Sequence, residues 1–302
     1  MVWEANVIEW LQTSLSCAAD FAKYFDFFGA ETGLLILVLV VMFCWKKKAG
    51  QKLALIVSCV NLWLPMIKSV VLRPRPYMEH PGRVNPLALS DEGAAAMDVV
   101  AQGYSFPSMH SASIPAVYFW LAKEAKKNWL WIVAGALTVL VGVSRVVAGM
   151  HYPTDVLAGW ILGFAVIGVF VLLDRYVHKA WLYYAILLIS AIPGLFYVRT
   201  TDYFTALGCL IGAEAAFSFE RKYVNYEDTR RIPAMLLRVF GAVLIYLVVN
   251  KLLKLPFDKQ FLAGTSLAAF LIRTARYAII MFLIMGVYPK VFPLYERVGR
   301  KA

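Results

Sequence analysis

Apolar residues occur along this chain in long runs that alternate with short polar segments. A helix needs about 20 predominantly apolar residues to cross the hydrocarbon core of a bilayer. Division of the runs by this length predicts eight or nine membrane-spanning helices, near 29–45, 53–72, 109–122, 129–148, 154–173, 181–198, 203–219, 233–250 and 261–288. The expected fold class is therefore all-α, a polytopic membrane helix bundle.

The amino-terminal segment has a different pattern. Apolar and polar positions alternate there at helical spacing, as Trp3, Glu4 and Val7 illustrate. Such a segment is too polar to span a bilayer and is typical of a helix that lies in the interface. The expected organisation has three parts: an interfacial amphipathic helix at 1–28, a core at 29–175 and additional transmembrane helices at 176–302.

Composition supports a membrane protein. Of the 302 residues, 61% are hydrophobic and only 16% are charged, whereas a soluble domain has about 25% charged residues. The opening residues lack the pattern of a cleaved signal peptide. The 4 cysteines have no metal-binding spacing and are expected to be buried thiols.

The formal net charge of +11 is spread over the segments between the predicted spans. This distribution is typical of cytoplasmic loops and argues against nucleic acid as a partner. Most bases fall on one side: Lys46–Lys48, Lys52, Lys123, Lys126, Lys127, Arg175, Lys179, Arg221, Lys222, Arg230 and Arg231. With that side in the cytoplasm, the polar segments 73–104 and 149–153 face outward. We expect an integral protein of the plasma (inner) membrane with an extracytoplasmic site.

Polar residues of catalytic type interrupt the apolar pattern at V-S-R-V-V-A-G-M-H-Y-P-T-D-V-L, residues 143–157. His151 and Asp155 are four residues apart, so on a helix they share one face. A carboxylate on one imidazole nitrogen leaves the other available as a nucleophile or base. Arg145 supplies a cation with forked donors suited to phosphate. Taken alone, the His–Asp spacing is weak evidence and is more typical of a simple helix-start hydrogen bond.

Two further segments are expected at the same membrane face, K-S-V-V-L-R-P-R-P at 68–76 and F-P-S-M-H-S at 106–111. A phosphoryl group in transfer needs cations and N–H donors around its equator and a titratable group at each pole. The three segments contain these groups: the cations Lys68, Arg75 and Arg145, the hydroxyl of Ser108, the backbone near Met109, and the imidazoles of His110 and His151. No pattern indicates a metal site.

These segments resemble the three signature motifs of the phosphatidic acid phosphatase type 2 superfamily, which includes lipid phosphate phosphatases, glucose-6-phosphatase and vanadium haloperoxidases. The motifs occur here as Lys-x6-Arg-Pro, Pro-Ser-x-His and Ser-Arg-x5-His-x3-Asp within residues 68–155. The resemblance implies a six-span phosphatase core, which leaves about three extra carboxy-terminal spans.

The resemblance also implies a role for each motif residue. His151 resembles the nucleophile that forms a phosphohistidine, and Asp155 the residue that orients it. His110 resembles the acid that protonates the leaving oxygen. The phosphate cradle comprises Lys68, Arg75, Ser108, Met109 and Arg145. Met109 departs from the family pattern, which has Gly there. Its backbone N–H is retained, and we interpret the side chain as a change in pocket shape.

The implied function is a metal-independent integral-membrane phosphatase that needs no cofactor. Its substrate would be a lipid phosphate or pyrophosphate of the phosphatidic acid, sphingoid-base or polyprenyl (isoprenoid) type. Two alternatives remain open: a sugar-phosphate phosphatase of the glucose-6-phosphatase type, and a transporter or scaffold that has retained the motifs. A haloperoxidase is least compatible, because it requires a soluble bundle.

Charges in the apolar carboxy-terminal third are costly and need partners. Similar depth in the predicted topology favours pairing of Glu214 with Arg273 or Arg276, with a substrate or transport role as the alternative. Arg73, next to the first motif, is predicted to serve structure or lipid headgroups. Gly159 and Gly163 form a small-xxx-small pair that predicts close helix packing.

Overall fold

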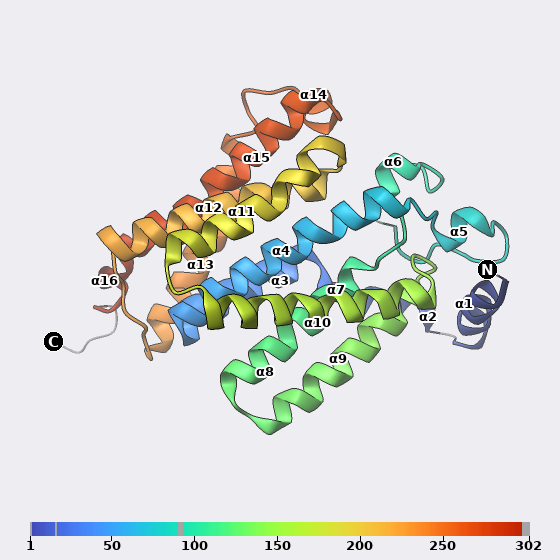
Figure 1. Cartoon of the computed structure of the whole chain (residues 1–302), viewed down its shortest axis with the longest axis horizontal. Helices are drawn as coiled ribbons and strands as arrows, with labels where there is room; N and C mark the ends of the chain where they lie inside the picture. The colour runs from blue at the N-terminus through green and yellow to red at the C-terminus, as the bar shows by residue number, and fades with distance from the viewer. Residues whose placement is uncertain (1, 16, 90–92, 298–302) are drawn as a thin grey trace. The chain divides into compact units, whose positions relative to one another are not determined.

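The computed structural model describes residues 2–15, 17–89 and 93–297, and these ranges contain helices and no strand (Figure 1). The longer helices are α4 (Lys47–Val71), α9 (Asn128–Val147), α10 (Pro153–Tyr176), α11 (Ala180–Tyr197), α12 (Thr201–Tyr223), α13 (Ile232–Leu252) and α15 (Leu267–Phe282). The shorter ones are α1 (Val2–Ser14), α2 (Ala18–Gly29), α3 (Glu31–Val40), α5 (Pro76–Glu79), α6 (Val99–Gln102), α7 (Met109–Ile114), α8 (Trp120–Ala125), α14 (Lys259–Ala263) and α16 (Phe292–Tyr295).

Within the described ranges, 6 helices are long and apolar enough to cross a membrane, or 7 if the bent pair Asp20–Gly29 and Glu31–Trp45 is one span. The chain is thus a polytopic helical membrane protein, although this count is lower than the eight or nine spans predicted. The stretch predicted to span at 109–122 forms a helical segment only from Met109 to Ala125, with a π-helical turn at Pro115–Phe119, and this segment is shorter than the about 20 residues that a span needs. The other difference is α12, whose apolar run includes Glu214 and Glu220.

The chain forms two compact units, which cut across the predicted segments. Unit 1 comprises the described residues of Met1–Leu34 and Trp63–Tyr176, and unit 2 those of Leu35–Leu62 and Val177–Ala302. The amino-terminal helices α1 and α2 therefore belong to the same unit as all three motifs. Their placement in the membrane interface stays a prediction.

In unit 1, α7 packs against α2, α9 and α10. The contact with α10 is close at both predicted glycines: a Cβ on Gly159 would lie 2.7 Å from the Ser108 carbonyl oxygen, and one on Gly163 2.3 Å from that of Ala112. Neither position has room for a methyl group against the backbone of α7. The prediction of close packing at this small-residue pair is confirmed.

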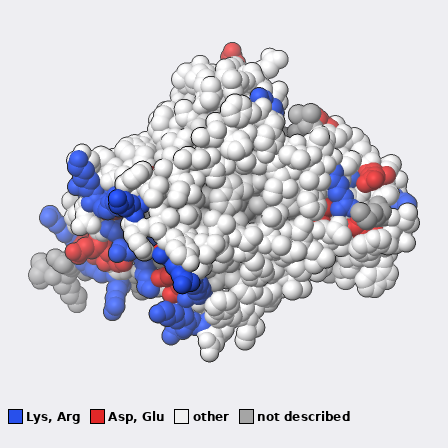
Figure 2. All heavy atoms as spheres, in the orientation of Figure 1, with Lys and Arg blue, Asp and Glu red and all other residues white. Residues whose placement is uncertain are grey.

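In unit 2, α12 packs along α15, and the rings of Phe204 and Phe270 stack with centroids 4.5 Å apart. The buried Arg238 is paired near the basic end of this unit, where its Nη2 binds the Glu296 carboxylate over 2.9 Å, and Arg231 donates to the backbone carbonyl of the same residue. Figure 2 shows Lys and Arg gathered around the end of the unit at which Figure 1 draws α16.

The predicted partner of Glu214 is wrong. Both carboxylate oxygens of Glu214 are buried without a hydrogen-bond partner in the described part of the chain. Arg276 donates instead to the side chain of Asn250 over 2.7 Å. Depth along a helix places residues at one level of the membrane, but it does not say which way each helix face points.

Candidate active site

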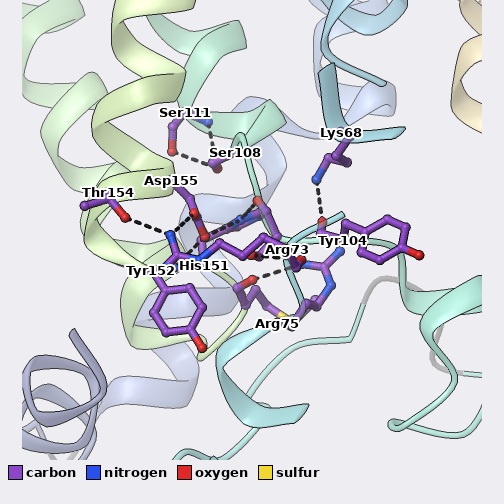
Figure 3. Close-up of polar contacts among 12 residues, drawn as sticks. Lys68, Arg73, Arg75, Tyr104, Ser108, Ser111, His151, Tyr152, Thr154 and Asp155 are labelled. Carbon is purple, nitrogen blue, oxygen red and sulfur yellow. Dashed lines mark hydrogen bonds and ion pairs between the residues drawn. The ribbon is translucent and has the colours of Figure 1, made fainter. Parts of the chain in front are cut away.

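Three segments that are far apart in the sequence meet through backbone hydrogen bonds. The amide of Ser105, just before the second motif, donates to the Arg73 carbonyl over 2.8 Å. The amide of Ser108 donates to the carbonyl of Asp155, in the third motif, over 3.1 Å. Figure 3 shows the resulting cluster between α10, the start of α7 and the loop that carries Tyr104. The motifs therefore lie at one place in unit 1.

His151 lies in the turn between α9 and α10 and is 5% exposed. Its Nδ1 is 2.7 Å from the carbonyl oxygen of Ser105. A carbonyl can only accept, so Nδ1 carries the hydrogen and Nε2 of the neutral ring has the lone pair. Burial lowers the pKa of His151 from 6.5 to about 3, and the charges of Lys68 and Arg75 act in the same direction. The ring is thus neutral at physiological pH, with Nε2 ready to act as a nucleophile or base.

Asp155 does not make the predicted hydrogen bond to His151, because its Oδ2 is 3.9 Å from Nδ1. The helix begins at Pro153, so His151 precedes it and the helical spacing does not apply. Asp155 instead accepts from the Tyr152 amide over 2.8 Å and from Arg73 Nη1 over 2.7 Å. Its carboxylate fixes the turn that carries His151, while the Ser105 carbonyl fixes the ring.

Arg73 joins this turn to the amino-terminal helix α1. Its guanidinium donates to Asp155, to the Thr154 hydroxyl over 2.8 Å and to Glu4 Oε2 over 2.7 Å. It also lies over the ring of Tyr152, 3.8 Å from the centroid. The Glu4 carboxylate is fully buried and accepts from the Thr154 hydroxyl as well. Of the two uses predicted for Arg73, these contacts favour the structural one.

Two of the predicted cradle cations, Lys68 and Arg75, bind backbone carbonyls. Lys68 donates to the Tyr104 carbonyl over 2.7 Å. Arg75 is 5% exposed and donates to the carbonyls of Gln102, Gly103 and Met150. These contacts orient both cations, and the charges of both act on the His151 ring.

Ser108 and Met109 lie at the start of α7. The Ser108 hydroxyl is fully buried and caps the helix by accepting from the Ser111 amide, and it lies 2.9 Å from the Ser111 hydroxyl. Met109 is the first residue of the helix and is half-buried. Backbone N–H groups at such a helix start are suited to an anion.

His110 and Arg145 meet at a residue that the sequence analysis missed. His110 Nε2 lies 3.2 Å from Oδ1 of Asp26, and Arg145 Nη1 binds the same oxygen. Arg145 Nη2 also donates to the Ala22 carbonyl over 2.7 Å, which ties α9 to α2. The signal for Asp26 was present in the sequence as a single acid within the aromatic run Y-F-D-F-F.

The charge of Lys68 acts on both His110 and His151. In both rings burial is the largest cause of a lowered pKa, and the Lys68 charge acts in the same direction. The described residues include no group of three or more His, Cys, Asp or Glu side chains that could hold a metal ion.

Comparison with known protein families identifies two adjoining regions. Residues 50–179 match the PAP2 superfamily, and residues 204–297 match the family described as PAP2 superfamily phosphatase, transmembrane extension. The chain belongs to the PAP2 superfamily. The first match contains all three motifs of this PAP2 protein, and the second lies within unit 2.

Three relatives carry functional names. The chain is 32% identical over 148 residues to phosphatidylglycerophosphatase B of Bacillus subtilis and 30% identical over 128 residues to undecaprenyl-diphosphatase of Sulfolobus acidocaldarius. These matches cover 45% and 42% of this chain, and 64% and 56% of the relatives. The bacitracin transport permease protein BcrC of Bacillus licheniformis is 45% identical over 60 residues, which are 20% of this chain and 28% of that protein. No solved structure matches the chain.

Proposed function

We propose that this PAP2 protein is a metal-independent phosphatase that hydrolyses a lipid phosphate or pyrophosphate through a phosphohistidine. The observation that carries the proposal is the state of His151. Its Nδ1 is committed to the Ser105 carbonyl, its Nε2 has a lone pair, and burial keeps its pKa at about 3. A neutral, oriented imidazole beside Lys68 and Arg75 suits nucleophilic attack on an anionic phosphoryl group.

In the first step, Nε2 of His151 attacks phosphorus and the bond from phosphorus to the leaving oxygen breaks. The cations Lys68 and Arg75 stabilise the charge on the equatorial oxygens. His110 donates a proton to the leaving oxygen, so that the lipid departs as an alcohol, or as a phosphate when the substrate is a pyrophosphate. The enzyme is left with a phosphohistidine at His151 and a neutral imidazole at His110.

In the second step, a water molecule attacks phosphorus on the same face that the leaving group vacated. His110 takes a proton from this water, the phosphorus–nitrogen bond breaks, and inorganic phosphate leaves. The ring of His151 returns to the neutral form with Nδ1 still bound to Ser105. Atoms and charges balance without a metal ion.

A lipid substrate is supported by the place of the site in the chain. His151 lies between α9 and α10, two helices that satisfy the length and composition of membrane spans. A site at the end of two spans lies at the membrane surface, where it admits a headgroup while the tail stays in hydrocarbon. The names of two relatives, a phosphatidylglycerophosphatase and an undecaprenyl-diphosphatase, support the same class. The charge distribution of the loops favours the extracytoplasmic face of the plasma membrane.

The test is release of inorganic phosphate by the full chain in lipid vesicles. The panel contains phosphatidic acid, phosphatidylglycerol phosphate, sphingosine phosphate, undecaprenyl pyrophosphate and glucose 6-phosphate. We expect activity on at least one lipid, inhibition by vanadate, no inhibition by EDTA, and loss of activity in His151→Ala. His178, an exposed residue outside the motifs, supplies the matched control His178→Ala.

Each alternative predicts a different result. Preference for glucose 6-phosphate would identify a sugar-phosphate phosphatase. Full biological activity of His151→Ala would identify a transporter or scaffold that has kept the motifs. EDTA inhibition reversed by magnesium would refute the metal-independent mechanism.

A further inference from the structure

The amino-terminal helix α2 brings a carboxylate to the leaving-group side of the site. Asp26 Oδ1 lies 3.2 Å from Nε2 of His110 and is bound by Nη1 of Arg145. Nε2 of His110 is buried and makes no hydrogen bond of acceptable geometry. The interaction of the ring with Asp26 is therefore one of charge at short range, which acts only when the ring carries a proton.

The fit of α2 against His110 is close. A Cβ on Gly29, one helical turn after Asp26, would lie 2.7 Å from Cδ2 of His110 and 3.0 Å from its Cβ. Gly29 thus lets the backbone of α2 approach the imidazole directly. The helix that carries Asp26 and the ring it faces have little freedom to separate.

Three charged groups from three elements act on the His110 ring: Lys68 of α4, Arg145 of α9 and Asp26 of α2. Burial and the two cations among them lower the pKa of His110 below its usual range. Asp26 is the one anion of this set, and it acts in the opposite direction. Its carboxylate also binds Arg145.

We propose that Asp26 is a positioning residue for proton transfer, whose carboxylate favours the protonated form of His110 against the burial and the two cations that oppose it. This inference rests on the proposed function, because it assigns a partner to the general acid of that reaction. Asp26 need not touch the phosphoryl group; it acts through His110. The amino-terminal segment then takes part in catalysis as well as in anchoring.

The proposal predicts a dependence on the leaving group. General acid catalysis contributes about 10²–10⁴-fold when the leaving oxygen is basic, and little when the departing anion is already stable. An alkyl phosphate such as dioctanoyl phosphatidic acid needs the proton from His110. A 4-nitrophenyl phosphate does not, because the nitrophenolate leaves unprotonated.

The experiment compares Asp26→Asn with the wild type on these two substrates, with the full chain in detergent micelles. We expect kcat for the alkyl phosphate to fall on the order of 100-fold, and kcat for 4-nitrophenyl phosphate by less than about 3-fold. Asp26→Glu should restore part of the alkyl activity. Asp20, an exposed acid on the same helix, supplies the matched control Asp20→Asn, which should leave both rates unchanged.

A double-mutant cycle separates this role from a structural one. If Asp26 acts through His110, Asp26→Asn has no further effect in a His110→Ala background. Additive losses, or equal losses on both substrates, would overturn the proposal. A lower KM with unchanged kcat would also overturn it, since Asp26 would then be a competitor of the phosphate. If the wild type hydrolyses neither substrate nor any lipid of the panel, the proposed function itself fails.

Discussion

Both compact units bury carboxylates among apolar helices, and Glu220 of unit 2 is paired with Lys47 over 3.1 Å. The units differ at one buried acid of unit 2, Glu214. In unit 1, Asp155 is fully buried and accepts hydrogen bonds from Arg73 and from the Tyr152 amide. Glu4, also fully buried, accepts from Arg73 and Thr154. In unit 2, Glu214 is 4% exposed, and both its oxygens lack a partner among the described residues.

The two units therefore differ in whether every buried carboxylate of their described residues has a hydrogen-bond partner. Burial of a charged group is costly unless it is paired and hydrogen-bonded. In unit 1 a connected set of donors offsets that cost and also fixes the turn that carries His151. Glu214 is isolated from any such set, so the structure gives it no role in the same chemistry. The following predictions test this contrast, starting with the largest effect.

Removal of an imidazole from unit 1 should have the largest effect. We expect His151→Ala and His110→Ala each to lower turnover of an alkyl phosphate by about 10⁴–10⁶-fold, because residues that act as a unit lose nearly all catalysis together. Phosphate release measures the effect, with His178→Ala as the control. Turnover that persists within 10-fold, on the scale of about 1.4 kcal/mol, would show that unit 1 does not contain the catalytic centre.

Loss of Arg73 should destabilise the fold, because it leaves two buried acids without their cation. We expect Arg73→Ala to reduce the free energy of unfolding in detergent by about 3–5 kcal/mol. The matched control is Arg83→Ala, which breaks an exposed pair with Glu9 and should cost about 0–1 kcal/mol. Equal losses in the two variants would mean that the network around Asp155 is not a determinant of stability.

Stability should depend on pH through His151. Because burial lowers the pKa of His151 from 6.5 to about 3, the unfolded chain binds a proton in this interval where the folded protein does not. The stabilisation is therefore complete above about pH 6.5 and is lost as the pH falls toward about 3. Thermal unfolding between these limits should show a steeper loss for the wild type than for His151→Gln. Parallel slopes would contradict a neutral, buried ring.

The smallest effect is expected in unit 2. Replacement of Glu214 by Met removes an unpartnered polar group and retains a similar volume, so the free energy of unfolding should rise by about 1 kcal/mol. Phosphate release should not change. A loss of turnover in Glu214→Met, with normal folding, would give unit 2 a functional acid and remove the contrast between the units.

The features that side-chain patterns specify could be predicted from the sequence alone. The helical class, the close approach at Gly159 and Gly163, and the meeting of the three motif segments were all predictable from periodicity and residue type. The partner of the His151 ring was not, since it is the carbonyl of Ser105 and a backbone atom leaves no signature in the sequence. The catalytic roles of the motif residues stay predictions.

Pairs of side chains that are far apart along the chain could not be predicted from the sequence either. Asp26 is distant from His110 along the chain, and a single acid in an amphipathic segment looks like any solvated side chain. Glu214 was predicted to pair with an arginine because the two lie at a similar depth in the predicted topology. The prediction was wrong because depth does not determine which way each helix face points. Both cases need the packing of separate helices, which no local pattern records.

The missing methyl groups at Gly159 and Gly163 have a mechanical consequence. Helix α10 packs on the backbone of α7, with side-chain atoms of Ser111 and Pro115 also close to the two glycines, and the Ser108 amide donates to the Asp155 carbonyl at that crossing. The helix that carries His110 and the turn that carries His151 are thereby joined by direct backbone contact. A side chain at either glycine would push these two segments apart.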